Sequence, residues 1–201
     1  MTSEMLLALA LGYLLGSIPF GLVLTRAGGK GDIRAIGSGS IGATNVLRTG
    51  SKPLAALTLI LDCLKATAAI FIAQQWLGEP TALFAAVGAM LGHLYPVWIK
   101  FRGGKGVASL LGVLIALAPI AAVLYAALWI FLLLTVRISS VAGIAAAATV
   151  PVTAALIGYD YLFPMLLGFA VLILWKHREN ISRLMAGTEP SFGSAKTSPT
   201  R

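Results

Sequence analysis

Long runs of apolar residues, separated by short polar segments, dominate the pattern along the chain. A helix needs about 20 such residues to cross the ~30 Å hydrocarbon core of a membrane. The predicted spans are 4–24, 54–77, 81–99, 107–134, 138–157 and 160–176. This pattern predicts an all-α polytopic membrane protein.

The fourth run decides how often the chain crosses the membrane. As one helix, 107–134 would be about 42 Å long, and Pro119 lies in its middle, where a helix kinks or breaks. Division at Pro119 gives seven segments, of which 107–118 is short at about 18 Å. A single long helix, with one later gap wrongly assigned, gives five crossings, and both alternatives stay open.

Charged residues predict the orientation. Lys and Arg gather in 25–53, in 100–106 and in the tail from Lys176, whereas Glu79 and Asp160 mark other gaps. Basic segments stay in the cytoplasm under the positive-inside rule. If all three share that face, the number of crossings is odd, the N-terminus is outside and the C-terminus is cytoplasmic.

Composition supports a membrane protein and excludes several other classes. Of 201 residues, 58% are hydrophobic and 11% are charged, and the mean hydropathy of +0.91 is far above that of soluble domains. The net charge is +8, but the basic residues are not interleaved with aromatic residues, so no nucleic-acid partner is predicted. One cysteine, Cys63, and two histidines predict no metal site. Glu4 stands where a signal peptide carries a cation, so the first span is expected to be retained.

The first basic segment contains a stretch that is rich in glycine and hydroxyl residues. Its candidate binding residues are Gly37, Ser38, Gly39, Asn45 and Arg48. A glycine-rich turn that leads into a helix favours anion binding. A flexible linker has the same composition, and the residues alone leave these two alternatives open.

The second basic segment follows His93 and combines cations with glycine. Its candidate residues are Arg102, Gly103, Gly104, Lys105 and Gly106. Glycine lets backbone N–H groups approach an anion closely, and Lys adds full charge. Gly106 stands where a Walker A motif has Ser or Thr, so no nucleotide site is predicted. A loop that serves only topology is the alternative, although topology does not require glycine; His93 is either structural or part of the site.

The third segment, 176–189, predicts a short amphipathic helix that ends near Gly187. Helical spacing puts two pairs on shared faces: His177 with Asn180, and Glu179 with Arg183. An interfacial helix without chemistry is the alternative. Within the second span, Asp62 and Lys65 are expected to neutralise each other as a structural pair, or to support the site.

Together these segments resemble the bacterial acyl-phosphate-dependent glycerol-3-phosphate acyltransferases, the PlsY family. The resemblance covers nearly the whole chain and includes Gly16–Gly21, Gly37–Gly50, Gly92–Ser109 and His177–Glu189 in order. It implies transfer of a fatty acyl group from acyl phosphate to the 1-hydroxyl of glycerol 3-phosphate, giving lysophosphatidic acid and phosphate. It also implies an inner-membrane enzyme that uses no metal and no cofactor.

The resemblance also implies roles for particular residues. Ser38 and Arg48 match a functional serine and arginine, and the glycines around Lys105 match a glycerol 3-phosphate site. His177 and Asn180 match functional residues. Glu189 matches a structural glutamate. Ser40 stands where relatives have Asn.

Three rival functions remain. Acyl-CoA acyltransferases carry a His-x4-Asp pair, but Trp98 and Ser182 occupy the fifth position after the two histidines. Organophosphate transporters have internal repeats and midplane polar sites, and neither is visible. A scaffold for anionic head groups is the third.

The chain is therefore expected to form one acyltransferase domain, 1–189, with a disordered cytoplasmic tail, 190–201. The active site is expected at the cytoplasmic face of the membrane. The expected partners are the two substrates and membrane lipid. A soluble enzyme that makes acyl phosphate is a further candidate.

Overall fold

The computed structural model describes residues 1–191, and all regular secondary structure in this part of the chain is helical. The predicted tail, 190–201, therefore lies almost wholly outside the described residues. The α-helices are α1 Ser3–Gly16, α2 Phe20–Ala27, α3 Ala43–Leu47, α4 Lys52–Leu77, α5 Ala82–Leu94, α6 Val107–Leu117, α7 Pro119–Val136, α8 Ser139–Leu156, α9 Phe163–Lys176 and α10 Arg178–Met185. Four single turns of 3-10 helix are η1 Ile33–Ala35, η2 Glu79–Thr81, η3 Val97–Ile99 and η4 Asp160–Leu162.

Within residues 1–191, five helical stretches are long and apolar enough to span a membrane. They are Ser3–Ala27, Lys52–Leu77, Glu79–Ile99, Pro119–Val136 and Ser139–Leu156. A sixth candidate joins Asp160–Lys176 to Arg178–Met185 across a bend of 57°. Leu7, Val123 and Phe131 are more than half exposed on these helices, as expected for side chains that face lipid. The prediction of an all-helical integral membrane protein is confirmed.

The run from 107 to 134 is two helices. Ala118 separates the 11-residue α6 from the 18-residue α7, and Pro119 is the first residue of α7. Proline is tolerated there because the first N–H of a helix has no partner within the helix. The break at Pro119 is thus where the sequence predicts it, and α6 is an apolar helix too short to meet the usual length for a span.

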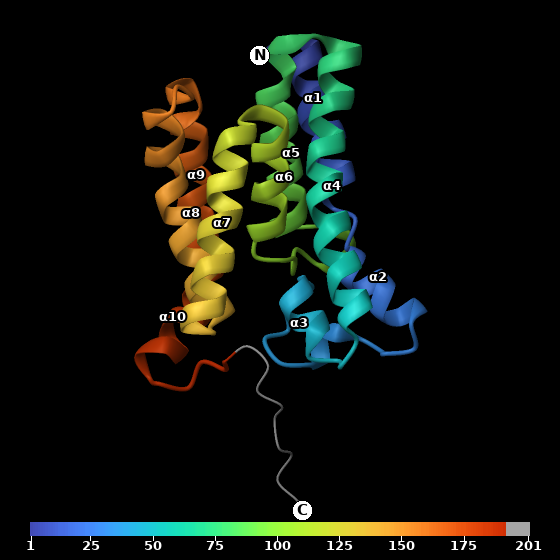
Figure 1. Cartoon of the computed structure of the whole chain (residues 1–201). Coiled ribbons are helices and arrows are strands. Elements are labelled where there is room, and N and C mark those ends of the chain that lie inside the picture. The colour runs from blue at the N-terminus through green and yellow to red at the C-terminus, as the bar shows by residue number, and fades with distance from the viewer. Residues whose placement is uncertain (192–201) are drawn as a thin grey trace, which may run out of the picture.

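Small residues bring the helices close together. Gly12 and Gly16 of α1 lie directly against the backbone of Ala85 and Ala89 in α5, so that a Cβ at either glycine would overlap it. Such small-residue contacts are typical of helix pairs in membranes. Figure 1 shows α1, α4, α5 and α6 in one group beside α7, α8 and α9.

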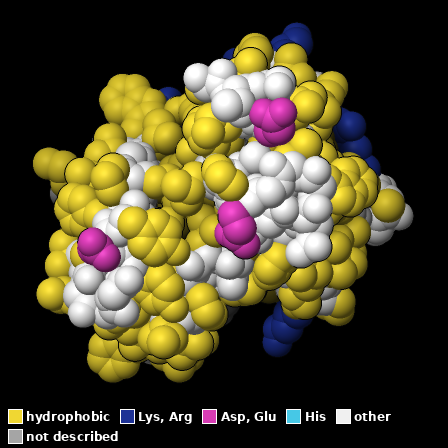
Figure 2. Space-filling view, turned by 90° about the horizontal axis from the view of Figure 1, so that it is seen from above, with side chains coloured by type: hydrophobic (Ala, Val, Ile, Leu, Met, Phe, Trp, Pro, Cys, Tyr) yellow, Lys and Arg dark blue, Asp and Glu magenta, His cyan; other side chains and the backbone are white. Residues whose placement is uncertain are grey.

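The two ends of the bundle differ. The N-terminus lies at one end, whereas α2, α3 and α10 lie at the other, together with the basic segments (Figure 1). Figure 2 views the molecule from the end of the bundle that holds the N-terminus. Carboxylates lie on this face, whereas Lys and Arg appear only toward its margins. Glu79 in η2 and Asp160 in η4 belong to turns at this end.

Candidate active site

Asn45 organises the first polar loop from its place in α3. Its amide nitrogen donates to three carbonyl oxygens of the same loop at 2.8–3.0 Å, those of Ile33, Ile36 and Ser40. Its Oδ1 accepts from the backbone N–H of Ser38 and from Nη1 of Arg48, each at 3.3 Å. Because its amide is fully engaged, Asn45 holds Ser38 and Arg48 in position.

Two glycines allow this loop to fold as it does. Gly37 and Gly39 have φ values of +55° and +67°, which other residues rarely adopt. A Cβ at Gly37 would also overlap the Arg48 side chain. These glycines shape the loop, and a flexible linker does not describe it.

Glycines also determine the second segment. Gly104 lies against the ring of His93, and its N–H donates to the His93 carbonyl oxygen at 3.0 Å. Gly106 has φ +90° and is the N-terminal cap of α6. Between them, Lys105 extends to Asn180, to whose Oδ1 it donates a short hydrogen bond.

The third segment is the amphipathic helix that the sequence predicts, with Gly187 at φ +66° just past its end. Asn180 donates to Glu189 at 2.6 Å, and Ser140 of α8 donates to the same oxygen at 2.7 Å. Arg183 pairs with Glu189 at 2.7 Å. The expected pair of Glu179 with Arg183 is therefore replaced by one that ties the helix to the residues after it.

His177 lies at the bend between α9 and α10. Its Nδ1 is 2.8 Å from the Ile173 carbonyl oxygen, which can only accept, so Nδ1 carries the proton. A neutral imidazole then leaves Nε2 as an acceptor.

Asp62 and Lys65 form the predicted ion pair on α4, at 2.7 Å, with both side chains only 2% exposed. Lys65 also donates to the Ile18 carbonyl oxygen at 2.8 Å. Nδ1 of His93 lies 3.7 Å from the same carboxylate. The pair therefore supports the wall of the site as well as neutralising itself.

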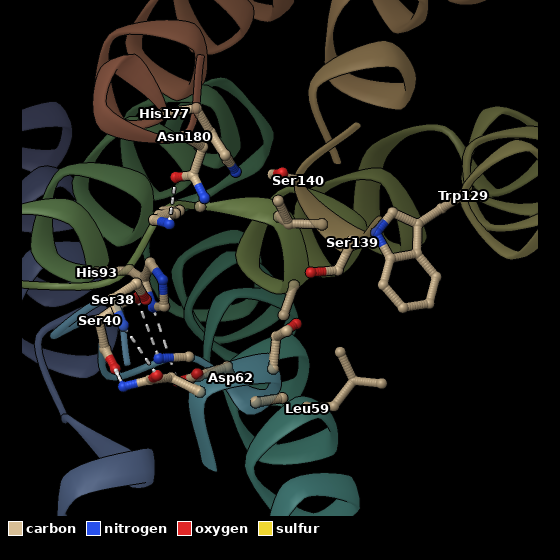
Figure 3. Close-up of a pocket in the computed structure, with 18 of the residues that line it drawn as sticks. Ser38, Ser40, Leu59, Asp62, His93, Trp129, Ser139, Ser140, His177 and Asn180 are labelled. Atoms are coloured by element: carbon tan, nitrogen blue, oxygen red, sulfur yellow. Dashed lines mark hydrogen bonds and ion pairs between the residues drawn. The ribbon is translucent and has the colours of Figure 1, made fainter. Parts of the chain in front are cut away.

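These segments surround one pocket (Figure 3). The centre of a water molecule can occupy about 100 Å³ of it. The predicted residues that line it are Ser38, Asn45, Arg48, Asp62, His93, Lys105, Gly106, His177, Asn180 and Glu189. Three segments that lie far apart in the sequence thus supply one site.

Six other predicted residues do not line the pocket. Gly37, Gly39, Gly103 and Gly104 shape its loops, and Lys65 lies behind Asp62. Arg102 is exposed and lies outside the lining. The nearby Lys105, not Arg102, brings the positive charge of this segment to the site.

Ten lining residues were not predicted. Six of them lie close to predicted residues in the sequence, and they are Ser40, Gly42, Ala43, Thr44, Val107 and Ala108; the other four are Leu59, Trp129, Ser139 and Ser140. Leu59 of α4 and Trp129 of α7 lie on one side of the pocket, across from Ser38 and Ser40 (Figure 3). The serine pair at the start of α8, which begins two residues after Arg137, is the one signal that the sequence offers for this part of the site.

Lys105 is the most perturbed cation of the pocket outside the spans. Burial is the main cause that lowers its pKa to about 8, and Arg183 and Arg48 lower it further, whereas Glu189 raises it. Lys105 and Arg48 both face the pocket, which therefore favours an anion.

The fold and the site define a class: an integral membrane enzyme whose cationic pocket lies beside apolar, membrane-spanning helices. A family model described as "Glycerol-3-phosphate acyltransferase" matches residues 6–187. The glycerol-3-phosphate acyltransferase of Mesorhizobium japonicum is 54% identical over 194 residues, 96% of this chain and 99% of the relative. That of Rhizobium etli is 53% identical over 189 residues, 94% of this chain and 92% of the relative.

Two solved structures are similar to this one. Both are of PlsY (YgiH), described as an integral membrane glycerol 3-phosphate acyltransferase, in a glycerol 3-phosphate form and a lysophosphatidic acid form. Each is 38% identical, covers 95% of this chain and 96% of its own, and the TM-scores are 0.88 and 0.86.

The chain belongs to the glycerol-3-phosphate acyltransferase family, and it is an enzyme of the PlsY type. The predicted family and the predicted glycerol-3-phosphate acyltransferase activity are confirmed, and the enzyme acts in phospholipid synthesis.

Proposed function

We propose that this acyltransferase takes its acyl group from acyl phosphate and gives lysophosphatidic acid and inorganic phosphate at the cytoplasmic face of the inner membrane. One observation carries the proposal: Arg48, Lys105 and the His177–Asn180 pair come from three separate segments and line one pocket. Two phosphorylated substrates require cations from more than one direction.

Lys105 and Arg48 hold the two phosphate groups. Both are charged, and both are positioned by Asn side chains, Lys105 by Asn180 and Arg48 by Asn45. Ser38 and Gly106 add a hydroxyl and a backbone N–H at the pocket wall. Ser40, in place of the usual Asn, can still donate through its hydroxyl.

The reaction is an acyl transfer between oxygen atoms. The 1-hydroxyl oxygen of glycerol 3-phosphate attacks the carbonyl carbon of acyl phosphate, and the bond from that carbon to the phosphate oxygen breaks. Acyl phosphate is already activated, so the enzyme's contributions are alignment and stabilisation of negative charge. The hydroxyl proton passes to a phosphate oxygen of the substrate, and no metal or cofactor takes part.

His177 orients the hydroxyl and does not store its proton. Its ring is held by the Ile173 carbonyl oxygen through Nδ1. In a Ser-His-Asp triad, the histidine that acts as general base donates from Nδ1 to a carboxylate, which stabilises the imidazolium. A backbone carbonyl is neutral and stabilises the imidazolium less.

The acyl chain reaches the pocket from the lipid. Leu59 and Trp129 belong to helices long enough to span the membrane, and both line the pocket. A chain that passes between them lies in apolar surroundings while the phosphate remains with the cations.

The whole domain, 1–189, serves this one site. Its seven helical segments run alternately along the bundle, with the N-terminus outside and the three basic segments in the cytoplasm. The substrates and membrane lipid are its partners, and a soluble enzyme that makes acyl phosphate is the candidate source of the donor.

Purified protein in detergent tests the reaction. With acyl phosphate and glycerol 3-phosphate, phosphate is expected to appear in equal amount with lysophosphatidic acid, and acyl-CoA is expected to give no product. Lys105→Met is expected to lower kcat/KM at least 100-fold. Lys100→Met is the matched control, because Lys100 is an exposed cation of the same segment, and it is expected to change the rate less than twofold. Product formation from acyl-CoA alone would contradict the proposed donor.

A further inference from the structure

The C-terminal end of α5 is held in an unusual way. The last carbonyl groups of a helix have no partners within it. Here three of them accept hydrogen bonds from three different elements: His93 from Gly104 N–H at 3.0 Å, Leu94 from Lys176 Nζ at 2.9 Å, and Tyr95 from Tyr13 Oη at 2.9 Å. The end of α5 is therefore a common anchor for α1, α9 and the second polar segment.

Two of these three donors stand next to residues of the pocket. Gly104 directly precedes Lys105, and Lys176 directly precedes His177 in the sequence. Lys105 and Asn180 then meet in a hydrogen bond across the site. The anchor thus fixes both ends of this contact, one through Gly104 and the other through Lys176.

Lys176 is well suited to this contact. Its ammonium group lies 4.6 Å from the centre of the Tyr95 ring, within the range of a cation–π interaction. A positive charge at the C-terminus of a helix is also favoured by the helix dipole. Lys176 does not line the pocket, so it does not touch the substrates.

We propose that Lys176 is a positioning residue that places His177 and Asn180 relative to Lys105 by docking the end of α9 onto the end of α5. The proposal rests on the proposed roles of those three residues. A displacement of about 1 Å in such an arrangement lowers a rate by as much as 100-fold, so a contact outside the pocket controls the reaction.

Three variants separate positioning from stability. Lys176→Met keeps the length of the side chain and removes its donor, and we expect kcat to fall at least tenfold because Lys105 and Asn180 are misaligned, while KM for glycerol 3-phosphate rises no further than in His177→Ala. Lys176→Arg retains a cationic donor and is expected to recover at least half of the wild-type kcat. Tyr13→Phe removes a hydrogen bond at the same anchor, but Tyr13 precedes no residue of the pocket, and kcat is expected to stay within twofold.

Thermal unfolding in detergent, measured on the same preparations, completes the test. We expect Lys176→Met and Tyr13→Phe to lower Tm by similar amounts, so that only the rates distinguish them. The inference is overturned if Lys176→Met keeps kcat within twofold, or if the two variants lose activity equally. Failure of the proposed donor looks different, because the wild-type protein would then release no phosphate from acyl phosphate at all.

Discussion

At the scale of single residues, the charge of Lys105 dominates the electrostatics of the pocket. It is partly buried, it donates to Asn180, and burial is the main cause that lowers its pKa to about 8. A group with this pKa is mostly charged at neutral pH and mostly neutral at pH 9. Binding of a substrate phosphate requires the charged form.

Enzyme activity should therefore fall with rising pH. We expect kcat/KM for glycerol 3-phosphate to be nearly constant below about pH 7.5 and to fall up to tenfold per pH unit above pH 8. Because the charged form is the active one and is lost as pH rises, the decline must lie on the alkaline side. Initial rates between pH 6.5 and 9.5 measure it.

Lys105→Arg is the control for this profile. A guanidinium group stays protonated throughout the range, so the variant should be less active but should show no alkaline decline. A decline of the same size in Lys105→Arg would assign the titration to another group.

His177 tests where the hydroxyl proton goes. If a substrate phosphate accepts it, His177→Ala loses only the orienting contact, and we expect kcat at saturating substrate to stay within about threefold while KM for glycerol 3-phosphate rises. Steady-state kinetics with both substrates varied give the two constants. A loss of kcat beyond 1,000-fold, with glycerol 3-phosphate binding intact, would make His177 the base.

At the scale of elements, Glu189 connects α8 and α10, two helices that are not consecutive in the sequence. It accepts from Ser140 at the start of α8 and from Asn180 in α10, and it pairs with Arg183. Burial alone would raise the pKa of Glu189, but these hydrogen bonds and the Arg183 charge outweigh it and lower the pKa. The stability that follows is present above the unfolded pKa, near 4.3, and is lost as pH falls through the lower folded value.

Glu189→Gln should therefore destabilise the protein at pH 7. Loss of one partner from a buried, charged network lowers the free energy of unfolding by about 1–3 kcal/mol, which for a chain of this size lowers Tm by several degrees. Activity should fall with it, because Asn180 loses a fixed partner. Glu179→Gln, an exposed carboxylate on the same helix, is the control, and an equal effect of both variants would disprove the special role of Glu189.

The elements themselves were largely predictable. Hydropathy locates the long helices, and the restricted backbone of Pro119 locates the break between α6 and α7, because both are local properties of the chain. Contacts between elements are not local. The pairing of Arg183 with Glu189 instead of Glu179 depends on how the chain turns after α10, and spacing along a helix contains no such information.

The site, like the elements, has a part that local sequence predicts and a part that depends on contacts between elements. Glycines and cations near Ser38 and Lys105 indicate anion binding from composition alone. Leu59 and Trp129 are ordinary apolar residues of membrane helices, and only the packing of α4 and α7 on α6 brings them to the pocket. In the sequence, Lys176 is one of several basic residues of the tail, and only the fold shows that it contacts the end of α5.

At the scale of the whole molecule, the opposite placement of acidic and basic turns predicts the orientation in the membrane. In the described residues, the turns that hold Glu79 and Asp160 lie at one end of the bundle, and the turns that hold Lys30 and Arg137 lie at the other. With the basic end in the cytoplasm, the positive-inside rule is satisfied at every turn.

Single cysteines in a Cys63→Ala background measure this orientation directly. In right-side-out vesicles, a membrane-impermeant maleimide should label Glu79→Cys and Asp160→Cys, and in inverted vesicles it should label Lys30→Cys and Arg137→Cys. Arg137→Cys decides the number of crossings, because α6 and α7 together return the chain to the cytoplasm, whereas a single crossing over 107–134 would leave position 137 outside. Labelling of Arg137→Cys only from the outside would make 107–134 a single crossing despite the break at Pro119, and it would reduce the seven segments to six. A cytoplasmic C-terminus would then require 138–176 to cross only once as well, which gives five.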